Sequence, residues 1–474
     1  MDRVAGIFAL TALVTVTALS PSLAFANPPD DPYYSSQNSW QQGYPDQWGL
    51  HAIGFTDTDD SAWNIENGIA NPVIVAVLDT GLDYFHPDLD PANIWQNRAE
   101  IDNGIDDDNN GYVDDILGWN FVEDNNNPWD FSSHGTHVAG IIGAASNNGQ
   151  GVSGINWGVQ IMALKVMNFT GRGRTVPLAG AIYYAVDNGA KVINLSLGAV
   201  DNSLIQKEAI DYAHKNGVLV VVAAGNANQD TAVVTPAGLD NVVTVAAVTP
   251  DGERAGFSNW GDAVDIAAPG VDILSLRARR TDLSLVAGLE GYEPGQAFVG
   301  QQNRYYRATG TSFAAPFVSG AASLLYAQRP NISPVEVKRL ILQSAQDIDT
   351  PGSDLNTGYG ALDIQAALSA DTEFYLDAAL TSVQVTQQGK KAILQTLGSV
   401  AADKLKKAWI EIGSGEQPKK WTKVGSEIKK SITEDVLNEI DAKNFSGSSV
   451  WILKLVAEHK NGRQRESRFV LNLN

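Results

Sequence analysis

The sequence predicts an α/β protein in which helices flank a mostly parallel central sheet, followed by a small β-sandwich-like unit at the C-terminus. Two observations predict this fold. Continuous apolar runs alternate with helical segments over the first 370 residues, and the net charge changes sign at about that point. Continuous apolar runs are typical of strands that are buried on both faces, as strands are in parallel sheets.

Four apolar runs are candidate strands of the parallel sheet, and helical segments precede two of them. The runs are residues 73–78, 192–197, 218–223 and 242–247, and the helical segments are residues 178–188 and 204–215. In such sheets, ligands and catalytic groups gather at the carboxyl ends of the strands. Asp79 and Asn226 stand at or just after strand ends, so both are candidates for that edge.

Charge and pattern indicate a boundary near residue 370. Residues 371–474 carry a net charge of +3, whereas the residues before them carry −24. Residues 408–412 and 450–456 have the pattern of strands, and the Asn461-Gly462 pair is typical of a hairpin turn. We therefore expect an α/β domain over residues 51–370 and a small C-terminal β-rich domain over residues 371–474.

The first 26 residues have the pattern of a Sec-type signal peptide. Arg3 precedes an apolar stretch that leads to Ala24-Phe25-Ala26, which has the small residues of a cleavage site. The apolar stretch is too short for a transmembrane anchor. We expect cleavage near Ala26 and export, either to the extracellular medium or to the periplasm or cell envelope, with no transmembrane anchor left. Residues 27–50 are expected to form an N-terminal arm.

Composition excludes several classes of function. The formal net charge is −21, which argues against nucleic acid or an anionic membrane surface as the main partner. The chain has no cysteine, so a disulfide scaffold, a thiolate metal site and a cysteine nucleophile are all excluded.

Four polar residues have the chemistry of an acyl-transfer site. Ser312 begins a helix of small residues, where unpaired backbone N–H groups lie beside it. His134 could act as a base that Asp79 orients, and Asn226 could donate to a developing oxyanion. Taken singly, each residue also has a structural explanation, as a helix cap, a core histidine or a turn residue. His134 and His137 do not fit the zinc motif H-E-x-x-H, because they are three residues apart and no Glu lies between them.

The order of these residues, Asp then His then Ser, resembles that of the subtilisin-like serine proteases of the secreted bacterial type. The stretches that match are Asp79-Thr80-Gly81-Leu82-Asp83, His134-Gly135-Thr136-His137-Val138-Ala139-Gly140, Ser196-Leu197-Gly198, Ala224-Gly225-Asn226 and Gly310-Thr311-Ser312-Phe313-Ala314-Ala315-Pro316. The resemblance runs from about residue 31 to about residue 370 and implies a subtilisin-like α/β fold.

The resemblance implies a serine endopeptidase that cleaves proteins and peptides. Asp79 would orient His134, and His134 would act as general base and then as general acid. Ser312 would be the nucleophile that forms an acyl-enzyme. Asn226 and the backbone N–H of Ser312 would form the oxyanion hole, and His137 would be structural.

The same resemblance implies how substrate is held. The segment Ser196-Leu197-Gly198 would pair with an extended peptide and leave the peptide side chains to pockets. The expected partners are protein or peptide substrates, and the protein is expected to act as a monomer. The rival hypothesis is a catalytically silent peptide- or surface-binding protein that keeps the protease fold. Covalent labelling of Ser312 by a fluorophosphonate would discriminate between the two.

An acidic loop is a candidate site for structural Ca²⁺. Residues 102–124 contain seven Asp, and residues 106–111 have a D-x-D-x-N-G core. Such a core places carboxylate and amide oxygens at alternating positions around a glycine turn, although the Glu that an EF-hand needs is replaced by Leu117. The expected ligands are Asp106, Asp108, Asn110, Tyr112, Asp114 and Asp115. The alternative is a solvated acidic loop.

A second calcium site is implied by the resemblance alone. Its residues would be Asp31 from the N-terminal arm, Asp88 and Asn148. Asp88 lies in the intact segment His86-Pro87-Asp88-Leu89.

Overall fold

The computed structural model describes residues 28–200, 203–281, 293, 295–389, 391–416 and 418–473. The predicted signal peptide, residues 1–26, lies outside the described residues. Within the described part of the chain, every helix is too short or too polar to cross a membrane.

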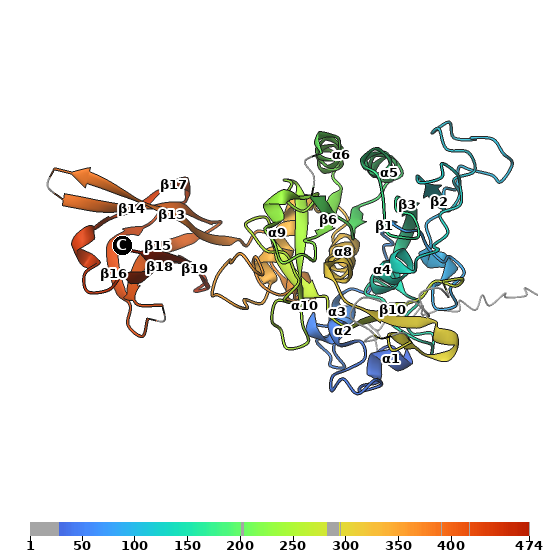
Figure 1. Ribbon diagram of the computed structural model, residues 1–474, viewed down its shortest axis with the longest axis horizontal. Coiled ribbons are helices and arrows are strands. Elements are labelled where there is room, and N and C mark those ends of the chain that lie inside the picture. The colour runs from blue at the N-terminus through green and yellow to red at the C-terminus, as the bar shows by residue number, and fades with distance from the viewer. Residues whose placement is uncertain are drawn as a thin grey trace, which may run out of the picture.

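A seven-stranded sheet, parallel throughout, forms the centre of the larger part of the molecule (Figure 1). Its strands, in spatial order, are β2 (Gly118–Asn120), β3 (Gln160–Lys165), β1 (Ile74–Asp79), β4 (Val192–Leu195), β6 (Leu219–Ala223), β8 (Val242–Val248) and β9 (Ile266–Pro269). The four predicted strands correspond to β1, β4, β6 and β8. The predicted α/β fold class is confirmed.

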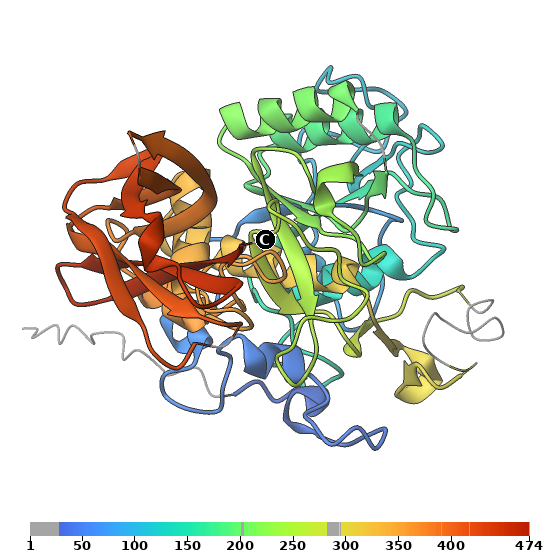
Figure 2. The same cartoon turned by 60° about the vertical axis from the view of Figure 1, so that its left-hand side comes forward.

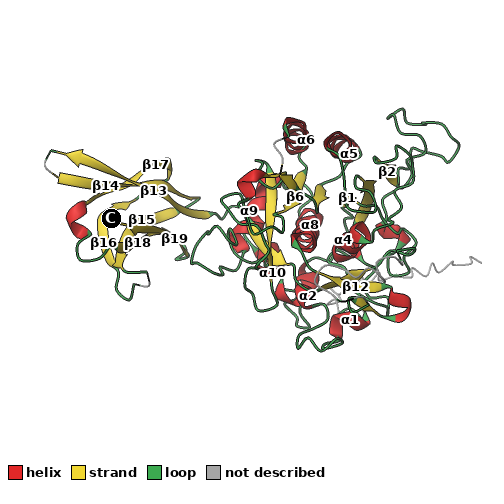
Figure 3. Cartoon of the chain, in the orientation of Figure 1, coloured by secondary structure: helices red, strands yellow, loops and turns green. Residues whose placement is uncertain are grey.

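Helices cover both faces of this sheet (Figure 3). The helices α5 (Thr175–Asp187) and α6 (Leu204–Lys215) pack on one face, and both were predicted from the sequence. The helices α4 (His134–Gly143) and α8 (Thr311–Gln328) pack on the other face. Both α4 and α8 are buried along almost their whole length, which their small side chains allow.

Shorter elements complete the first part of the chain. The helices are α1 (Pro32–Ser35), α2 (Trp48–Ala52), α3 (Ala62–Ile65), α9 (Pro334–Ser344) and α10 (Ile364–Ser369), with 3₁₀ turns η1 (Pro91–Asn93), η2 (Thr231–Val233) and η3 (Gln301–Asn303). The strands β10 (Ile273–Leu276), β12 (Tyr305–Ala308) and β11 (Phe298–Val299) form an antiparallel sheet, and β5 (Ala199–Val200) pairs with β7 (Val234–Thr235). The strand β12 leads into α8.

Two antiparallel sheets form the C-terminal part of the chain and enclose a core of their own (Figure 1). One has the order β13 (Leu376–Gln388), β14 (Lys391–Ala402) and β17 (Ile432–Asp441), and a 3₁₀ turn, η4 (Ala442–Asn444), follows β17. The other has the order β16 (Thr422–Ile428), β15 (Leu405–Ser414), β18 (Val450–His459) and β19 (Gln464–Asn472). The predicted hairpin at Asn461-Gly462 connects β18 to β19.

The two parts of the chain lie next to each other (Figure 2), and hydrogen bonds between their side chains form a polar seam. The carboxylate of Asp377 on β13 accepts hydrogen bonds from Gln343 Nε2 at 2.7 Å and from the hydroxyl of Tyr359 at 2.9 Å. The guanidinium of Arg465 on β19 lies 4.6 Å from the centre of the Tyr359 ring. Asp377 is therefore the residue of the C-terminal part that binds two side chains of the first part.

Replacing Asp377 with Ala removes the acceptor of both hydrogen bonds. The expected result is a loss of about 1–2 kcal/mol in the free energy of unfolding, because the hydroxyl of the half-buried Tyr359 loses its partner. Thermal and urea unfolding measure it. The matched control is Asp251→Ala, which changes an exposed carboxylate. Equal stability of the two variants would contradict the role given to this seam.

Candidate active site

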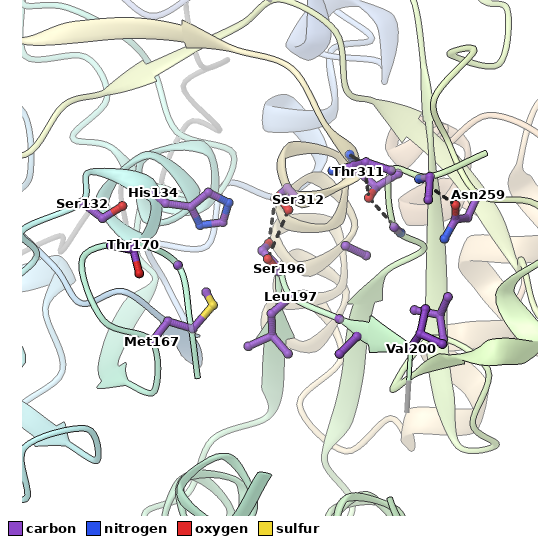
Figure 4. Close-up of a pocket in the computed structure, with 18 of the residues that line it drawn as sticks. Ser132, His134, Met167, Thr170, Ser196, Leu197, Val200, Asn259, Thr311 and Ser312 are labelled. Carbon is purple, nitrogen blue, oxygen red and sulfur yellow. Dashed lines mark hydrogen bonds between the residues drawn. The ribbon is translucent and has the colours of Figure 1, made fainter. Parts of the chain in front are cut away.

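The carboxyl ends of β1, β4 and β6 meet at one edge of the sheet, and a cleft of about 590 Å³ opens there (Figure 4). The first residues of α8 close one side of it, and the segment before α4 closes another. The residues that line it include Ser132, His134, Met167, Ser196, Leu197, Gly198, Asn226, Asn259, Thr311 and Ser312. Three of the four residues proposed for catalysis thus share one cleft.

Asp79, the fourth, lies directly behind His134. It is the last residue of β1 and is fully buried. Its Oδ1 lies 2.7 Å from Nδ1 of His134, which is the first residue of α4. The backbone N–H of Thr80 also donates to this oxygen. The carboxylate is thus fixed by its own strand end and can orient the imidazole.

The environment of His134 holds its proton more firmly than water does. Burial lowers the pKa of His134, but the charge and hydrogen bond of Asp79, with a smaller contribution from the charge of Asp130, outweigh burial. The net result is a pKa above the ordinary value of 6.5. The side chain of His134 remains 26 % exposed, so its ring can reach a molecule in the cleft.

Asp130 fixes the position of α4. Its buried carboxylate accepts hydrogen bonds from the Thr80 hydroxyl at 2.9 Å and from the Thr136 backbone and hydroxyl at 3.0 and 2.8 Å. The Thr80 hydroxyl in turn accepts the N–H of Gly135. The start of α4 is therefore tied to the end of β1, and so is the distance between His134 and Asp79.

His137 differs from His134 although both lie on α4. Burial lowers the pKa of His137 to about 3, so the ring is neutral. Its Nε2 donates to the carbonyls of Ile273 and Tyr306, at 3.0 and 3.2 Å. These bonds join α4 to the antiparallel sheet, which agrees with the structural role expected for His137.

Ser312 lies in the first turn of α8, where the backbone N–H groups have no partner within the helix. Gly310 precedes this turn with φ of +152°, a conformation that disfavours any residue with a Cβ. In this structure the Ser312 hydroxyl donates to the carbonyl of Ser196 at 3.1 Å. Among the described residues it makes no hydrogen bond with His134, a contact that often tightens only when substrate binds.

Asn226 faces the start of α8. Its Oδ1 accepts hydrogen bonds from the Thr311 backbone N–H at 2.9 Å and from the Thr311 hydroxyl at 2.8 Å. The amide nitrogen of Asn226 is then left to donate. Because Thr311 immediately precedes Ser312, this donor lies beside the N–H groups at the start of α8.

Asn259, which the sequence analysis missed, holds the loop that carries Asn226. Its Oδ1 accepts the N–H groups of Ala227 and Gln229, at 2.9 and 3.1 Å, and its Nδ2 donates to the carbonyl of Ala224. A Cβ on Gly225 would lie 2.4 Å from this nitrogen. Glycine at that position is therefore required by a side chain 34 residues away in the sequence, which no local pattern indicates.

The segment proposed to hold substrate lies between two strands. The structure ends β4 at Leu195, two residues earlier than predicted, and β5 begins at Ala199. Ser196 is buried, Leu197 is half-buried and Gly198 is exposed at the rim of the cleft. The main chain of Leu197 and Gly198 belongs to neither strand, so a peptide in the cleft could pair with it.

The acidic loop brings part of the predicted ligand set together. Carboxylate oxygens of Asp108, Asp115 and Glu100 lie within 4.8 Å of one another, and Asp115 is fully buried. Glu100 was missed because it precedes the D-x-D-x-N-G core. It also accepts the backbone N–H groups of Asp108 and Asp114, both at 3.0 Å.

The other predicted loop ligands bind within the loop. Asp106 accepts the N–H groups of Asn110 and Gly111, and Asp114 accepts those of Asn103 and Gly104. The Asn110 amide donates to Asp108 and Asp115. The ring of Tyr112 packs against other aromatic rings, at centroid distances of 5.0 to 5.6 Å.

Asp31, Asp88 and Asn148 also lie together. The Asp31 carboxylate accepts the N–H of Asn148 at 3.1 Å, and Asp88 accepts the Asn148 side-chain amide at 2.9 Å. Both carboxylates are fully buried. Burial raises the pKa of Asp31 to about 6 and that of Asp88 to about 7. Among the described residues, neither carboxylate has a salt bridge to a basic side chain.

Known proteins share this sequence and fold. A model of the subtilase family matches residues 70–360. The chain is 35% identical over 356 residues to the thermophilic serine proteinase of Bacillus sp. (strain AK1), covering 73% of each chain. It is 34% identical over 326 residues to thermitase of Thermoactinomyces vulgaris, covering 69% of this chain and 94% of thermitase.

Solved structures agree with these sequence matches. A protease structure from Pseudoalteromonas arctica superimposes with a TM-score of 0.54 at 30% identity, over 72% of this chain and 99% of that one. The residues that match the subtilase family, 70–360, include the parallel sheet and the residues that line the cleft. On this evidence the chain belongs to the subtilase family and is a serine-type endopeptidase.

Proposed function

We propose that this protein is an exported, calcium-stabilised endopeptidase in which Asp79, His134, Ser312 and Asn226 carry the reaction. The observation that carries the proposal is the 2.7 Å contact between the buried Asp79 and His134, in the same cleft as the first turn of α8. The reaction is hydrolysis of a peptide bond through an acyl-enzyme.

In the proposed mechanism, the Ser312 hydroxyl attacks the carbonyl carbon of the peptide bond while His134 Nε2 takes its proton. The carbonyl oxygen becomes an oxyanion that accepts hydrogen bonds from Asn226 Nδ2 and from the Ser312 N–H. Asp79 stabilises the imidazolium. Collapse of this intermediate expels the amine, which takes the proton from His134. Water then hydrolyses the ester by the same two steps and restores Ser312.

The substrate is proposed to be an extended, flexible segment of protein. The main chain of Leu197 and Gly198 supports this, because it belongs to neither strand and can pair with a peptide backbone of any sequence. The alignment of a peptide against this edge would bring its carbonyl to Ser312. Since the four reacting groups come from one chain, we propose that a monomer is sufficient for activity.

We propose that residues 51–370 form the peptidase domain, that residues 371–474 form a separate β-rich domain and that residues 27–50 form an N-terminal arm. Separate apolar cores in the two larger parts support the first division. Tyr34 and Trp48 are buried in the core of the first part, which indicates that the arm stabilises the peptidase domain. The pattern of residues 1–26 supports export with cleavage near Ala26.

Calcium fits both acidic clusters. Ca²⁺ prefers carboxylate and amide oxygens, and both clusters consist of these groups. Asp31 and Asp88 are buried without a basic partner among the described residues, so a divalent cation would offset the cost of burying their charges. Glu100, Asp108 and Asp115 would hold a second ion. The role of each ion would be to fix a loop, since neither cluster includes a residue that lines the cleft.

Replacing Ser312 with Ala should abolish turnover. Removal of the nucleophile lowers kcat by about 10⁴-fold or more in enzymes of this type. Hydrolysis of a denatured protein substrate measures this loss, beside the control Ser353→Ala, which changes an exposed serine. Equal inactivity of two folded proteins, wild type and Ser312→Ala, would refute catalysis and favour the silent binding protein.

As the pH is lowered, activity should fall with a midpoint above pH 6.5. The reason is that His134 must be neutral to take a proton and its pKa is raised. Asp79→Asn removes the charge that raises this pKa, so the acid limb of kcat/KM should move to lower pH while the rate falls by about 10⁴-fold. The pH profile of both proteins tests this. An acid limb that stays at the same pH in Asp79→Asn would contradict the assignment of His134.

Removal of calcium should lower stability. A ligand at 100 times its Kd adds about 2.7 kcal/mol to the free energy of unfolding. We therefore expect a chelator to lower the melting temperature of the wild-type protein. Asp88→Asn and Glu100→Gln should each reduce this calcium-dependent shift, whereas Asp107→Asn, at an exposed residue of the same loop, should leave it unchanged. A melting temperature that calcium does not affect would contradict both sites.

A further inference from the structure

A proline leaves the carbonyl of Ser312 without a partner in its own helix. In an α-helix each carbonyl accepts the N–H of the residue four positions later. The residue four positions after Ser312 is Pro316, which has no N–H. The carbonyl of Ser312 instead accepts a hydrogen bond from the hydroxyl of Ser196, the first residue after β4, at 2.6 Å. The hydroxyl of Ser196, which lies outside α8, therefore supplies the hydrogen bond that Pro316 cannot donate.

This hydroxyl is the end of a chain of three side chains. Ser319 Oγ donates to Asn194 Oδ1 at 2.8 Å, and Asn194 Nδ2 donates to Ser196 Oγ at 2.9 Å. Ser196 Oγ then donates to Ser312. All three bonds run in one direction, so each polarises the next. The three side chains are at most 3 % exposed.

The spacing of the residues explains why the chain can form. Ser312 and Ser319 are seven residues apart, which is two helical turns, so they lie on one face of α8. Asn194, on β4, and Ser196, the first residue after β4, are two residues apart, and their side chains lie close enough to hydrogen-bond. The two serines of α8 thus contact Asn194 and Ser196 through hydrogen bonds, between the apolar clusters that cover the two faces of the sheet. Figure 4 shows the end of the chain, between Ser196 and Ser312.

A polar chain in a buried sheet-to-helix contact fixes register in a way that apolar packing does not. An apolar contact tolerates small sliding, whereas the bonds from Ser319 to Asn194 and from Ser196 to Ser312 are lost when α8 moves along β4. The strand β4 leads into the segment proposed to pair with substrate. The helix α8 carries Ser312 and its N–H. The chain therefore links the position of the nucleophile to the position of the bound peptide.

We propose that Asn194 is a positioning residue for the reaction and acts through Ser196 on the carbonyl of Ser312. This inference rests on the proposed function of Ser312 as nucleophile. Asn194 does not line the cleft and contacts no substrate. Its loss should therefore lower kcat, through misplacement of Ser312 and its N–H, with little change in KM.

The test compares Asn194→Ala and Ser319→Ala with a matched control. We expect Asn194→Ala to lower kcat by about 10- to 100-fold, since small misplacement of reacting groups costs up to about 10²-fold. Ser319→Ala should lower kcat by about 3-fold, because it removes only the first donor of the chain. KM should stay within about 3-fold in both variants, since a residue that touches no substrate contributes no ground-state binding.

The control is Ser323→Ala. Ser323 lies one turn further along α8, is fully buried and accepts a hydrogen bond from Asn156 at 2.8 Å. Within the described residues, no hydrogen bond joins Ser323 to Asn194, Ser196 or Ser312. Its replacement should lower the melting temperature and leave kcat unchanged. An equal fall of kcat in Ser323→Ala and Ser319→Ala would overturn the proposal, because the effect would then belong to general packing of α8.

Rescue provides a second readout. Pro316→Ala restores the backbone N–H that, in a regular helix, donates to the carbonyl of Ser312. In the Asn194→Ala background it should raise kcat by at least about 3-fold, because the helix then holds the carbonyl itself. Absence of rescue, or an unchanged kcat in Asn194→Ala, would overturn the proposal. If Asn194→Ala does not fold, the comparison of kcat in Ser319→Ala and Ser323→Ala tests the proposal. A lower kcat in Ser319→Ala alone supports it, and an equal kcat in the two variants overturns it.

The outcome separates this inference from the proposed function. Wild-type protein that is folded but neither turns over substrate nor reacts with a fluorophosphonate refutes the proposed function. Wild-type protein that is active, with the same kcat in Asn194→Ala, refutes only the positioning role.

Discussion

The close packing of α8 against the parallel sheet is the constraint on which the cleft depends. This helix is buried along almost its whole length and contacts β4, β6 and β8. This packing places the first turn of α8 at the carboxyl edge of the sheet. Small residues make the approach possible: a Cβ on Gly320 would lie 2.8 Å from Ile155. Every strand of the sheet runs the same way, and Asp79 and the loop of Asn226 therefore arrive at the same edge as Ser312. Catalytic geometry is a consequence of this core packing.

Polar groups inside that core then refine the positions that packing sets only coarsely. Asp130 joins the start of α4 to the end of β1. The side chain of Asn259 binds the backbone of the loop that carries Asn226. The chain that ends at Ser196 does the same for Ser312. Each of these groups is buried and hydrogen-bonded, so each fixes a specific geometry without the energetic cost of an unpaired buried polar group. The carboxylates of Asp31 and Asp88 are the contrasting case, because burial raises the pKa values of both.

The sequence predicted those elements whose pattern is local. The four apolar runs became β1, β4, β6 and β8, and α5 and α6 were also predicted from periodicity. The strand β3 was missed because Lys165 interrupts its apolar run. The strands β2 and β9 were missed because they are short and, unlike the similarly short β4, do not belong to a longer strand-like run. Asn259 and Glu100 were missed for a different reason. Their roles depend on neighbours that are distant in sequence, or on a loop that folds back, and a single sequence carries no record of such contacts.

The central claim is that Ser312, deprotonated by His134, is the nucleophile of a serine endopeptidase. Reaction with a fluorophosphonate, followed by mass measurement of the intact protein and of its peptides, tests this claim most directly. The account predicts one adduct per chain on the peptide that contains Ser312, formed at a rate that falls sharply in His134→Ala. A folded protein that forms no adduct, or one labelled at another serine, would contradict the account.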